Sequence, residues 1–265
     1  MKSLWIRLGV ALGALAFALR IRRRVTLENL ARAFPETSAA ELRALARAAY
    51  VQLGRSLGEI LAMRGMSDAQ LEQLVRFDGW ERYEAVRARG VVCAVGHFGN
   101  FELLARAVAR RGVSLSIIVR SLQGGFNDWL FGSRIKTGVK HLPDKGSSSA
   151  AVALLRRGEV LAIAIDQNMM PKRGIFVPFF GVPACTTPAA AVYAQRADAA
   201  LIAAFPVRQP DGTHVVKVLG PFETAQKGHS AVEDLTAQLT RAVEDQVRQH
   251  PDHWFWLHRR WKTRP

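Results

Sequence analysis

Length, composition and charge limit the kinds of protein that this chain can be. Its 265 residues, 49% hydrophobic and 22% charged, suit one large folded domain and exclude a disordered chain or a polytopic membrane protein. The 37 Lys and Arg outnumber the 22 Asp and Glu, giving a net charge of +15, so anionic partners are expected: nucleic acid, an anionic membrane, or an acidic substrate or carrier protein. Two cysteines without metal or redox spacing favour a reducing, cytosolic environment.

The N-terminal segment is apolar from Leu4 to Leu19 except for Arg7, and arginines follow it at positions 20, 22, 23 and 24. As a helix it would span about 24 Å, less than a hydrocarbon core of about 30 Å. The basic cluster follows the apolar segment, which disfavours a cleaved signal peptide. Either residues 1–24 associate with the membrane, lying in it or barely crossing it, or they form the first core helix of a soluble protein. We expect the membrane-associating segment, because arginines bind anionic head groups.

Residues 25–265 are expected to form one domain, with a helical lead-in over 25–89 and an α/β core over 90–265. In the lead-in, Leu42, Leu45, Ala49 and Leu53 recur at helical spacing behind a possible cap at Ser38, which predicts one or two amphipathic helices. Another helix is predicted over 80–88.

Strands and helices alternate after Gly90. Short apolar runs predict buried strands at 91–95, 113–119, 160–165, 199–207 and 215–219. Helices are predicted at 101–111, 126–137, 147–157, 187–196 and 232–247. This alternation predicts an α/β fold, with a single mixed or parallel sheet flanked by helices.

One histidine follows directly after a predicted strand, and functional sites in such sheets lie at the ends of strands. His97 follows the 91–95 strand, and Glu102 lies in the first turn of the next helix, so the two side chains can meet. A carboxylate fixes the imidazole tautomer and stabilises the imidazolium, which makes a general base for a hydroxyl. By spacing alone, such a pair is more often structural.

Several segments carry a family resemblance. Residues 96–102, GHFGNFE, resemble the HxxxxD/E motif of the glycerolipid acyltransferase superfamily, and more closely the HFGNxE form of the bacterial lipid A biosynthesis acyltransferases, the lauroyl- and myristoyltransferases. Residues 29–36, 166–187 and 254–262 resemble, in order, the family's NL..AFPE, DQ…FVPFFG.PA.T and WLHRRWK segments. The four blocks span nearly the whole chain and are far more specific than HxxxxE alone.

The resemblance implies an acyltransferase that moves a fatty acyl chain from an acyl thioester, on acyl carrier protein or coenzyme A, to a hydroxyl of a lipid acceptor. That acceptor is expected to be a lipid A precursor, met at the cytoplasmic face of the inner membrane, with a membrane-facing groove for the acyl chain. His97 would be the general base and Glu102 its partner. No cofactor, metal or nucleic acid is expected.

Further positions are expected to bind substrate. Arg134 falls where the family carries a functional arginine, and it would hold an acceptor phosphate or stabilise the thioester oxyanion. Arg120 is a similar candidate. Asp166 ends a strand and could orient Arg134 or a substrate hydroxyl, and Asn100 and Gln167 complete the set.

Other functions stay open. Phe101 replaces a common Trp, and residues 168–174 are more apolar than in the family, which leaves the acceptor open between a lipid A precursor and a lysophospholipid, aminolipid or other glycolipid. A hydrolase, or a non-catalytic basic protein that binds membranes or nucleic acid, is the alternative of another class. The Trp-rich C-terminal segment favours packing or a membrane interface over nucleobase stacking.

Overall fold

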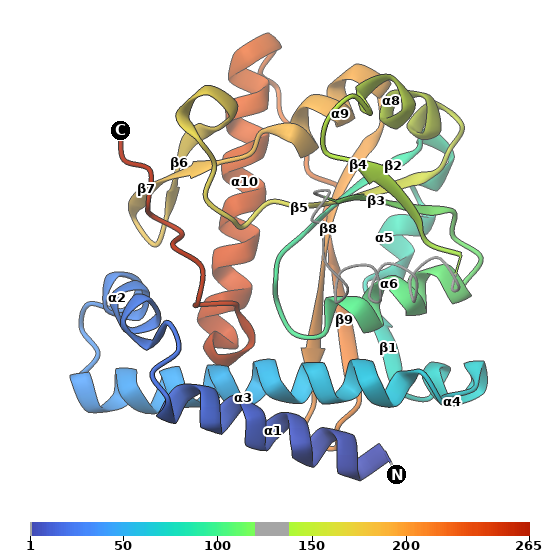
Figure 1. Cartoon of the computed structure of the whole chain (residues 1–265). Helices are drawn as coiled ribbons and strands as arrows, with labels where there is room; N and C mark the ends of the chain where they lie inside the picture. Colours follow the sequence, from blue (N-terminus) through green and yellow to red (C-terminus); the bar gives the residue numbers. More distant parts are fainter. Residues whose placement is uncertain (1, 120–137) are drawn as a thin grey trace.

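The computed structural model describes residues 2–119 and 138–265, and within these ranges it shows one seven-stranded sheet with helices on both faces (Figure 1). The strand order is β1-β9-β8-β2-β5-β3-β4. Strand β9 runs antiparallel to β8, and the other neighbouring strands pair in parallel. The predicted α/β class is therefore confirmed.

The central strands lie close to the predicted positions. They are β2 (Val91–Val95), β3 (Leu115–Val119), β5 (Val160–Ala164), β8 (Ala200–Arg208) and β9 (His214–Leu219). Their side chains alternate between two hydrophobic clusters, one on each face of the sheet. In β2, for example, Val92 and Ala94 enter one cluster, whereas Val91 and Cys93 enter the other. Burial on both faces is the reason that the strands read as unbroken apolar runs.

The helices follow the predicted pattern with shifted ends. They are α3 (Ala39–Met63), α5 (Trp80–Glu84), α6 (Phe101–Arg110), α8 (Ser148–Arg156), α9 (Ala189–Ala197) and α10 (Gly228–Gln249). A capping box between Ser38 and Glu41 starts α3, which runs as one helix. Helix α5 ends earlier than predicted, and a 3₁₀ turn (Arg87–Arg89) follows it. The helix predicted at 126–137 lies outside the described residues.

Several short elements escape prediction. Helix α4 (Asp68–Glu72) leads into β1 (Val75–Asp78), which comes from the predicted lead-in yet joins the sheet beside β9; β4 (Lys140–Pro143) lies at the opposite edge. Both edge strands have four residues and too little apolar pattern to stand out. Strands β6 (Ile175–Phe179) and β7 (Val182–Thr186) form a separate hairpin whose two prolines mask its pattern in sequence.

Helix α1 (Lys2–Ala18) packs along α3 through glycines, and α2 (Arg23–Ala33) follows it (Figure 1). A Cβ atom on Gly9 would lie 2.1 Å from the Gly54 carbonyl oxygen, and one on Gly58 would lie 2.4 Å from that of Trp5. The outer side of this segment exposes large apolar side chains, namely Leu4, Trp5, Leu8, Leu12, Leu15, Leu19 and Ile21. The N-terminal segment is therefore a surface helix rather than a buried core helix.

A membrane span is not formed by any one of the described helices, judged by length and hydropathy. Residues Leu4–Ala18 and Arg23–Ala33 reach the required length and composition only together, and they meet at a bend of 87°.

Replacing Gly9 by alanine is expected to destabilise the protein, because the new methyl group overpacks the α1–α3 contact at a cost of about 1–3 kcal/mol. The gain in helix propensity, about 1 kcal/mol, offsets part of this cost and leaves a net loss of up to about 2 kcal/mol. Urea unfolding monitored by circular dichroism measures the change. Gly65→Ala is the matched control, since a Cβ there meets no described atom within 4 Å. Equal stability of the two variants would contradict the packing shown.

Candidate active site

The turn after β2 is held in shape by its own sequence. Gly99 has φ +54° and lies so close to β8 that a Cβ atom would be 2.1 Å from the Pro206 carbonyl oxygen, so only glycine fits. The side-chain oxygen of Asn100 accepts a hydrogen bond from the Leu103 backbone N–H at 3.0 Å and caps α6. These contacts place His97 at the carboxyl edge of the sheet.

His97 meets a buried carboxylate at this edge. Its Nδ1 lies 2.8 Å from Oδ1 of Asp166, and its backbone N–H donates to Oδ2 at 2.6 Å. Asp166 follows β5, the parallel neighbour of β2, so the ends of the two strands bring the side chains together. The Asp166 side chain is 2% exposed, and that of His97 is 30% exposed. The pair is thus closed on the carboxylate side and reachable on the imidazole side.

The protonation of this pair follows from its surroundings. Burial by itself raises the pKa of Asp166, but the charge of His97 and hydrogen bonds from His97 and Trp254 outweigh burial and lower that pKa to about 2. An ionised carboxylate only accepts hydrogen bonds, so Nδ1 of His97 carries the proton. In the neutral imidazole, Nε2 is then the nitrogen without a proton, as a general base requires.

The C-terminal segment closes the other side of the turn. The Trp254 indole N–H donates to Oδ2 of Asp166 at 2.8 Å, and the Phe255 backbone N–H donates to the His97 carbonyl at 3.0 Å. Gly99 in turn donates its N–H to the His253 carbonyl at 2.8 Å. The side chains of Trp254, Trp256 and Trp261 are all buried, so packing is the observed role of this Trp-rich segment.

The Nε2 side of the imidazole faces a side-chain amide, and two aromatic rings lie beside the imidazole. Nε2 of Gln167 lies 3.3 Å from Nε2 of His97. The rings of Phe101 and Phe255 flank the imidazole, with centroids at 5.5 and 6.3 Å. A hydroxyl that displaces the Gln167 amide can therefore donate to Nε2. A surface hollow of about 290 Å³ lies at the far end of α6, lined by Leu71, Glu72, Val75, Phe77, Ala107, Arg110 and Arg111, and it takes no part in this site.

The four blocks of the family resemblance meet around this site. The Asn29 side-chain N–H donates to the carbonyls of Trp256 and His258, at 2.8 and 2.7 Å. Arg260 is fully buried and donates to the hydroxyl of Thr186. Blocks far apart in sequence thus build one structure behind His97.

The predicted site residues divide into three groups. His97, Asp166 and Gln167 lie together. Glu102 is buried in the first turn of α6, while Nδ1 of His97 bonds to Asp166, so the pairing of His97 with Glu102 stays a prediction. Asn100 uses its amide oxygen as the α6 cap and its nitrogen to donate to Glu59, contacts that favour a structural role. Arg120 and Arg134 lie outside the described residues.

Trp254 and His258 are site residues that the sequence did not assign. Their only signal was the resemblance of residues 254–262, which gives position but no partner. The His258 ring nitrogen Nε2 accepts a hydrogen bond from the Asn168 backbone N–H at 2.8 Å, close behind Gln167. This contact holds the segment after β5 against the C-terminal segment.

The protein is expected to lose stability as the pH falls from 6.5 to 4, and His258→Gln to reduce that loss. Burial lowers the pKa of His258 from 6.5 to about 4. Between pH 6.5 and 4 the His258 side chain binds a proton in the unfolded chain but not in the folded protein, so the free energy of unfolding decreases as the pH falls. Glutamine can still accept from Asn168. Thermal unfolding at pH 7.5 and 5 measures the effect, with the exposed His229→Gln as control. Equal losses in wild type and His258→Gln would contradict the assignment.

Fold and site together define an α/β protein with a partly exposed imidazole hydrogen-bonded to a buried carboxylate at the carboxyl edge of its sheet. Comparison with known sequences is specific: the family described as bacterial lipid A biosynthesis acyltransferase matches residues 2–263. The chain therefore belongs to the bacterial lipid A biosynthesis acyltransferase family.

Curated relatives agree with this membership. The chain is 30% identical over 264 residues to the lipid A biosynthesis lauroyltransferase of Escherichia coli K12, covering 98% of this chain and 85% of the relative. It is 26% identical over 267 residues to the lipid A biosynthesis palmitoleoyltransferase of the same organism, covering 97% and 85%. A lipid A biosynthesis acyltransferase of Haemophilus influenzae is 27% identical over 219 residues, covering 80% and 69%.

Proposed function

We propose that the protein transfers a fatty acyl chain from an acyl thioester to a hydroxyl of a lipid A precursor. Family membership and the names of the relatives support the reaction and the acceptor. The observation that carries the mechanism is the contact between Nδ1 of His97 and the ionised Asp166, which makes Nε2 the nitrogen that takes a proton.

The reaction proceeds by attack of the lipid hydroxyl itself. The hydroxyl takes the place of the Gln167 amide at Nε2 of His97 and gives up its proton as its oxygen bonds to the thioester carbonyl carbon. Collapse of the tetrahedral intermediate breaks the carbon–sulfur bond, and the leaving thiolate recovers the proton from the imidazolium. Asp166 stabilises the imidazolium between these steps. Glu102 is proposed to support the base as a second carboxylate. Arg120 and Arg134 are proposed to bind the anionic groups of donor and acceptor.

The donor is proposed to be acyl carrier protein or coenzyme A. Both carry the thioester that the reaction needs, and both are acidic, so the net charge of +15 favours their approach. The same charge favours a phosphorylated lipid acceptor.

The protein is proposed to act at the cytoplasmic face of the inner membrane. Leu4, Leu8, Leu12 and Leu15 are each about half exposed along one side of α1, and the arginines at positions 20, 22, 23 and 24 follow directly. An apolar helix face with a basic cluster suits an anionic membrane surface. The contact of α1 with α3 favours a helix lying along the membrane.

A transfer assay tests this function. Purified protein with anionic phospholipid vesicles is given acyl carrier protein and coenzyme A thioesters of several chain lengths, with a lipid A precursor or a lysophospholipid as acceptor. Mass spectrometry is expected to show one acyl chain added to the lipid A precursor. Transfer to the lysophospholipid alone would show that the acceptor is a lysophospholipid and not a lipid A precursor. Release of free fatty acid alone would indicate a hydrolase. Failure of the folded protein to use either thioester would reject the proposal.

A further inference from the structure

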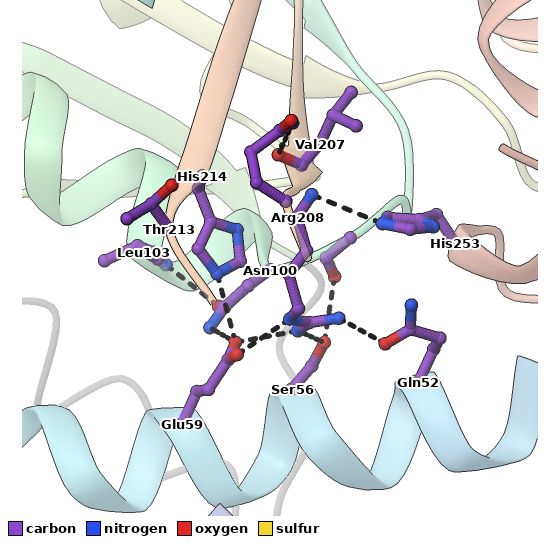
Figure 2. Close-up of polar contacts among 12 residues, drawn as sticks. Gln52, Ser56, Glu59, Asn100, Leu103, Val207, Arg208, Thr213, His214 and His253 are labelled. Atoms are coloured by element: carbon purple, nitrogen blue, oxygen red, sulfur yellow. Dashed lines mark hydrogen bonds and ion pairs between the residues drawn. The ribbon is translucent and has the colours of Figure 1, made fainter. Parts of the chain in front are cut away.

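A buried ionic network joins α3 to strands β8 and β9 and to Asn100 in the turn after β2 (Figure 2). Arg208, the last residue of β8, has a side chain that is 2% exposed and binds both carboxylate oxygens of Glu59 at 2.7 Å. His214, facing Arg208 across the β8–β9 pair, places Nε2 3.4 Å from the same carboxylate. The guanidinium also donates to the side-chain oxygens of Gln52 and Ser56, at 2.5 and 2.9 Å.

The network holds Gly99 and Asn100, two of the three residues that connect His97 to α6. Glu59 accepts a hydrogen bond at 2.9 Å from the Asn100 side-chain nitrogen, the same side chain that caps α6. Ser56 donates its hydroxyl to the Gly99 carbonyl at 3.4 Å. Backbone and side chain of the turn are thus both held by α3, three residues or fewer from the imidazole.

The network also reaches the C-terminal segment. The Arg208 backbone N–H donates to Nε2 of His253 at 3.2 Å, and the His253 carbonyl accepts from Gly99 at 2.8 Å. Gln52 donates to Asp252 at 3.0 Å. The turn is therefore enclosed by α3, β8 and the C-terminal segment. Arg208 of β8 contacts the other two, α3 through its guanidinium and the C-terminal segment through its backbone N–H.

The charges of the network serve geometry more than stability. Burial raises the pKa of Glu59, but hydrogen bonds and charge from His214 and Arg208 outweigh burial and lower it to about 2, so the pair is ionic at neutral pH. A buried ion pair gains little over apolar residues of the same volume, because both charges lose their hydration. A bidentate pair does, however, fix direction and distance far better than apolar contacts do.

We infer that Glu59 and Arg208 are positioning residues for acyl transfer, which hold the imidazole of His97 in register with its substrates through Gly99 and Asn100. Neither residue touches His97. Their effect is on the placement of the turn, and an error of about 1 Å in such a placement costs about 100-fold in rate. The inference rests on the acyl-transfer function proposed above.

Helix α3 gives this link a second consequence. Gln52, Ser56 and Glu59 lie on the face of α3 that meets the turn, whereas Gly54 and Gly58 meet α1. The network therefore connects His97, through one helix, to the helix whose leucines are exposed.

Two variants test the inference by different routes. Glu59→Leu with Arg208→Met removes the ion pair as a unit, so that neither of these two residues is left buried without the other. Asn100→Ser keeps a capping oxygen for α6 but is too short to reach Glu59. For both, kcat is expected to fall about 10- to 100-fold with KM changed less than about twofold, at a temperature where circular dichroism shows full folding.

Glu159→Gln is the matched control. The Glu159 side chain is 13% exposed against 12% for Glu59, it also pairs with two basic residues, and its pKa is likewise lowered to about 2. It lies before β5, at the amino edge of the sheet and away from His97. Its kcat is expected to equal that of wild type even if its melting temperature falls, because loss of stability alone does not move the turn.

The possible outcomes distinguish failure of the positioning role from failure of the proposed acyl-transfer function. Wild-type kcat in both folded test variants would overturn the positioning role while the transfer reaction stands. Should the double variant fail to fold, Asn100→Ser decides alone, and an unchanged kcat there overturns the role. A wild-type protein that transfers no acyl chain would instead reject the proposed function.

Discussion

Alanine in place of His97 is expected to reduce acyl transfer by about 10²- to 10⁴-fold, the usual contribution of a general base. The imidazole is the group proposed to take the proton of the hydroxyl, since Nδ1 is held by Asp166 and Nε2 faces the Gln167 amide, whose place the hydroxyl would take. Some loss of stability is expected, because the buried Asp166 carboxylate loses a hydrogen-bond partner, so the assay is run at a temperature where circular dichroism shows full folding. Single-turnover transfer from a labelled thioester measures the chemical step directly.

Two controls accompany this experiment. Gln167→Ala removes the neighbouring amide but no base, so its rate is expected to stay within about tenfold of wild type. KM for the thioester is expected to be nearly unchanged in His97→Ala, because the imidazole contributes to the transition state more than to binding. A His97→Ala protein with wild-type turnover would show that the site described here is not the site of transfer.

Asparagine in place of Asp166 is expected to cost a similar factor of about 10²–10⁴, for a reason specific to this geometry. Oδ2 of Asp166 accepts two N–H groups, from the His97 backbone and the Trp254 indole. An asparagine must place its carbonyl oxygen there and turn its NH₂ group toward Nδ1 of His97. Nδ1 then has to accept, Nε2 carries the proton, and the base is lost. The rate constant of transfer at pH 7.5 measures this effect.

Glu102→Gln resolves which carboxylate is the partner of His97. The family motif predicts a large loss for this variant, whereas the contact of Nδ1 with Asp166 predicts that Asp166→Asn loses at least as much. Comparable losses would assign separate roles to the two carboxylates. An active Asp166→Asn beside an inactive Glu102→Gln would contradict the pairing seen in the structure.

The interior of the fold could be predicted from sequence, because its signal is local. Val91–Val95 and Val160–Ala164 are apolar on both faces and so stand out as buried strands. The edge strands β1 and β4 have no such signal, since each pairs on one side only and mixes polar with apolar residues. Strand order is also absent from local pattern, because it depends on which strands pair across long connections.

The same limit applies to the site. His97 was predicted because its motif is contiguous, but its contact with Asp166 exists only because β2 and β5 are neighbours in the sheet. Asp166 was identified as a strand-end candidate without this partner. The contacts of Trp254 with Asp166 and of Glu59 with Arg208 are still harder to predict from sequence, since they join residues 88 and 149 positions apart. Such contacts follow from tertiary structure and leave no periodicity behind.

Closure of the turn by the C-terminal segment fixes when the protein can become active. Domains are synthesised from the N-terminus and begin to fold in that order. Residues 2–18 are therefore available to a membrane long before Trp254 and Phe255 exist to complete the support of Asp166 and His97. Under the proposed function, a growing chain would therefore be able to bind a lipid surface before the hydrogen bonds that hold His97 and Asp166 have formed, and it would not hydrolyse thioesters during its synthesis.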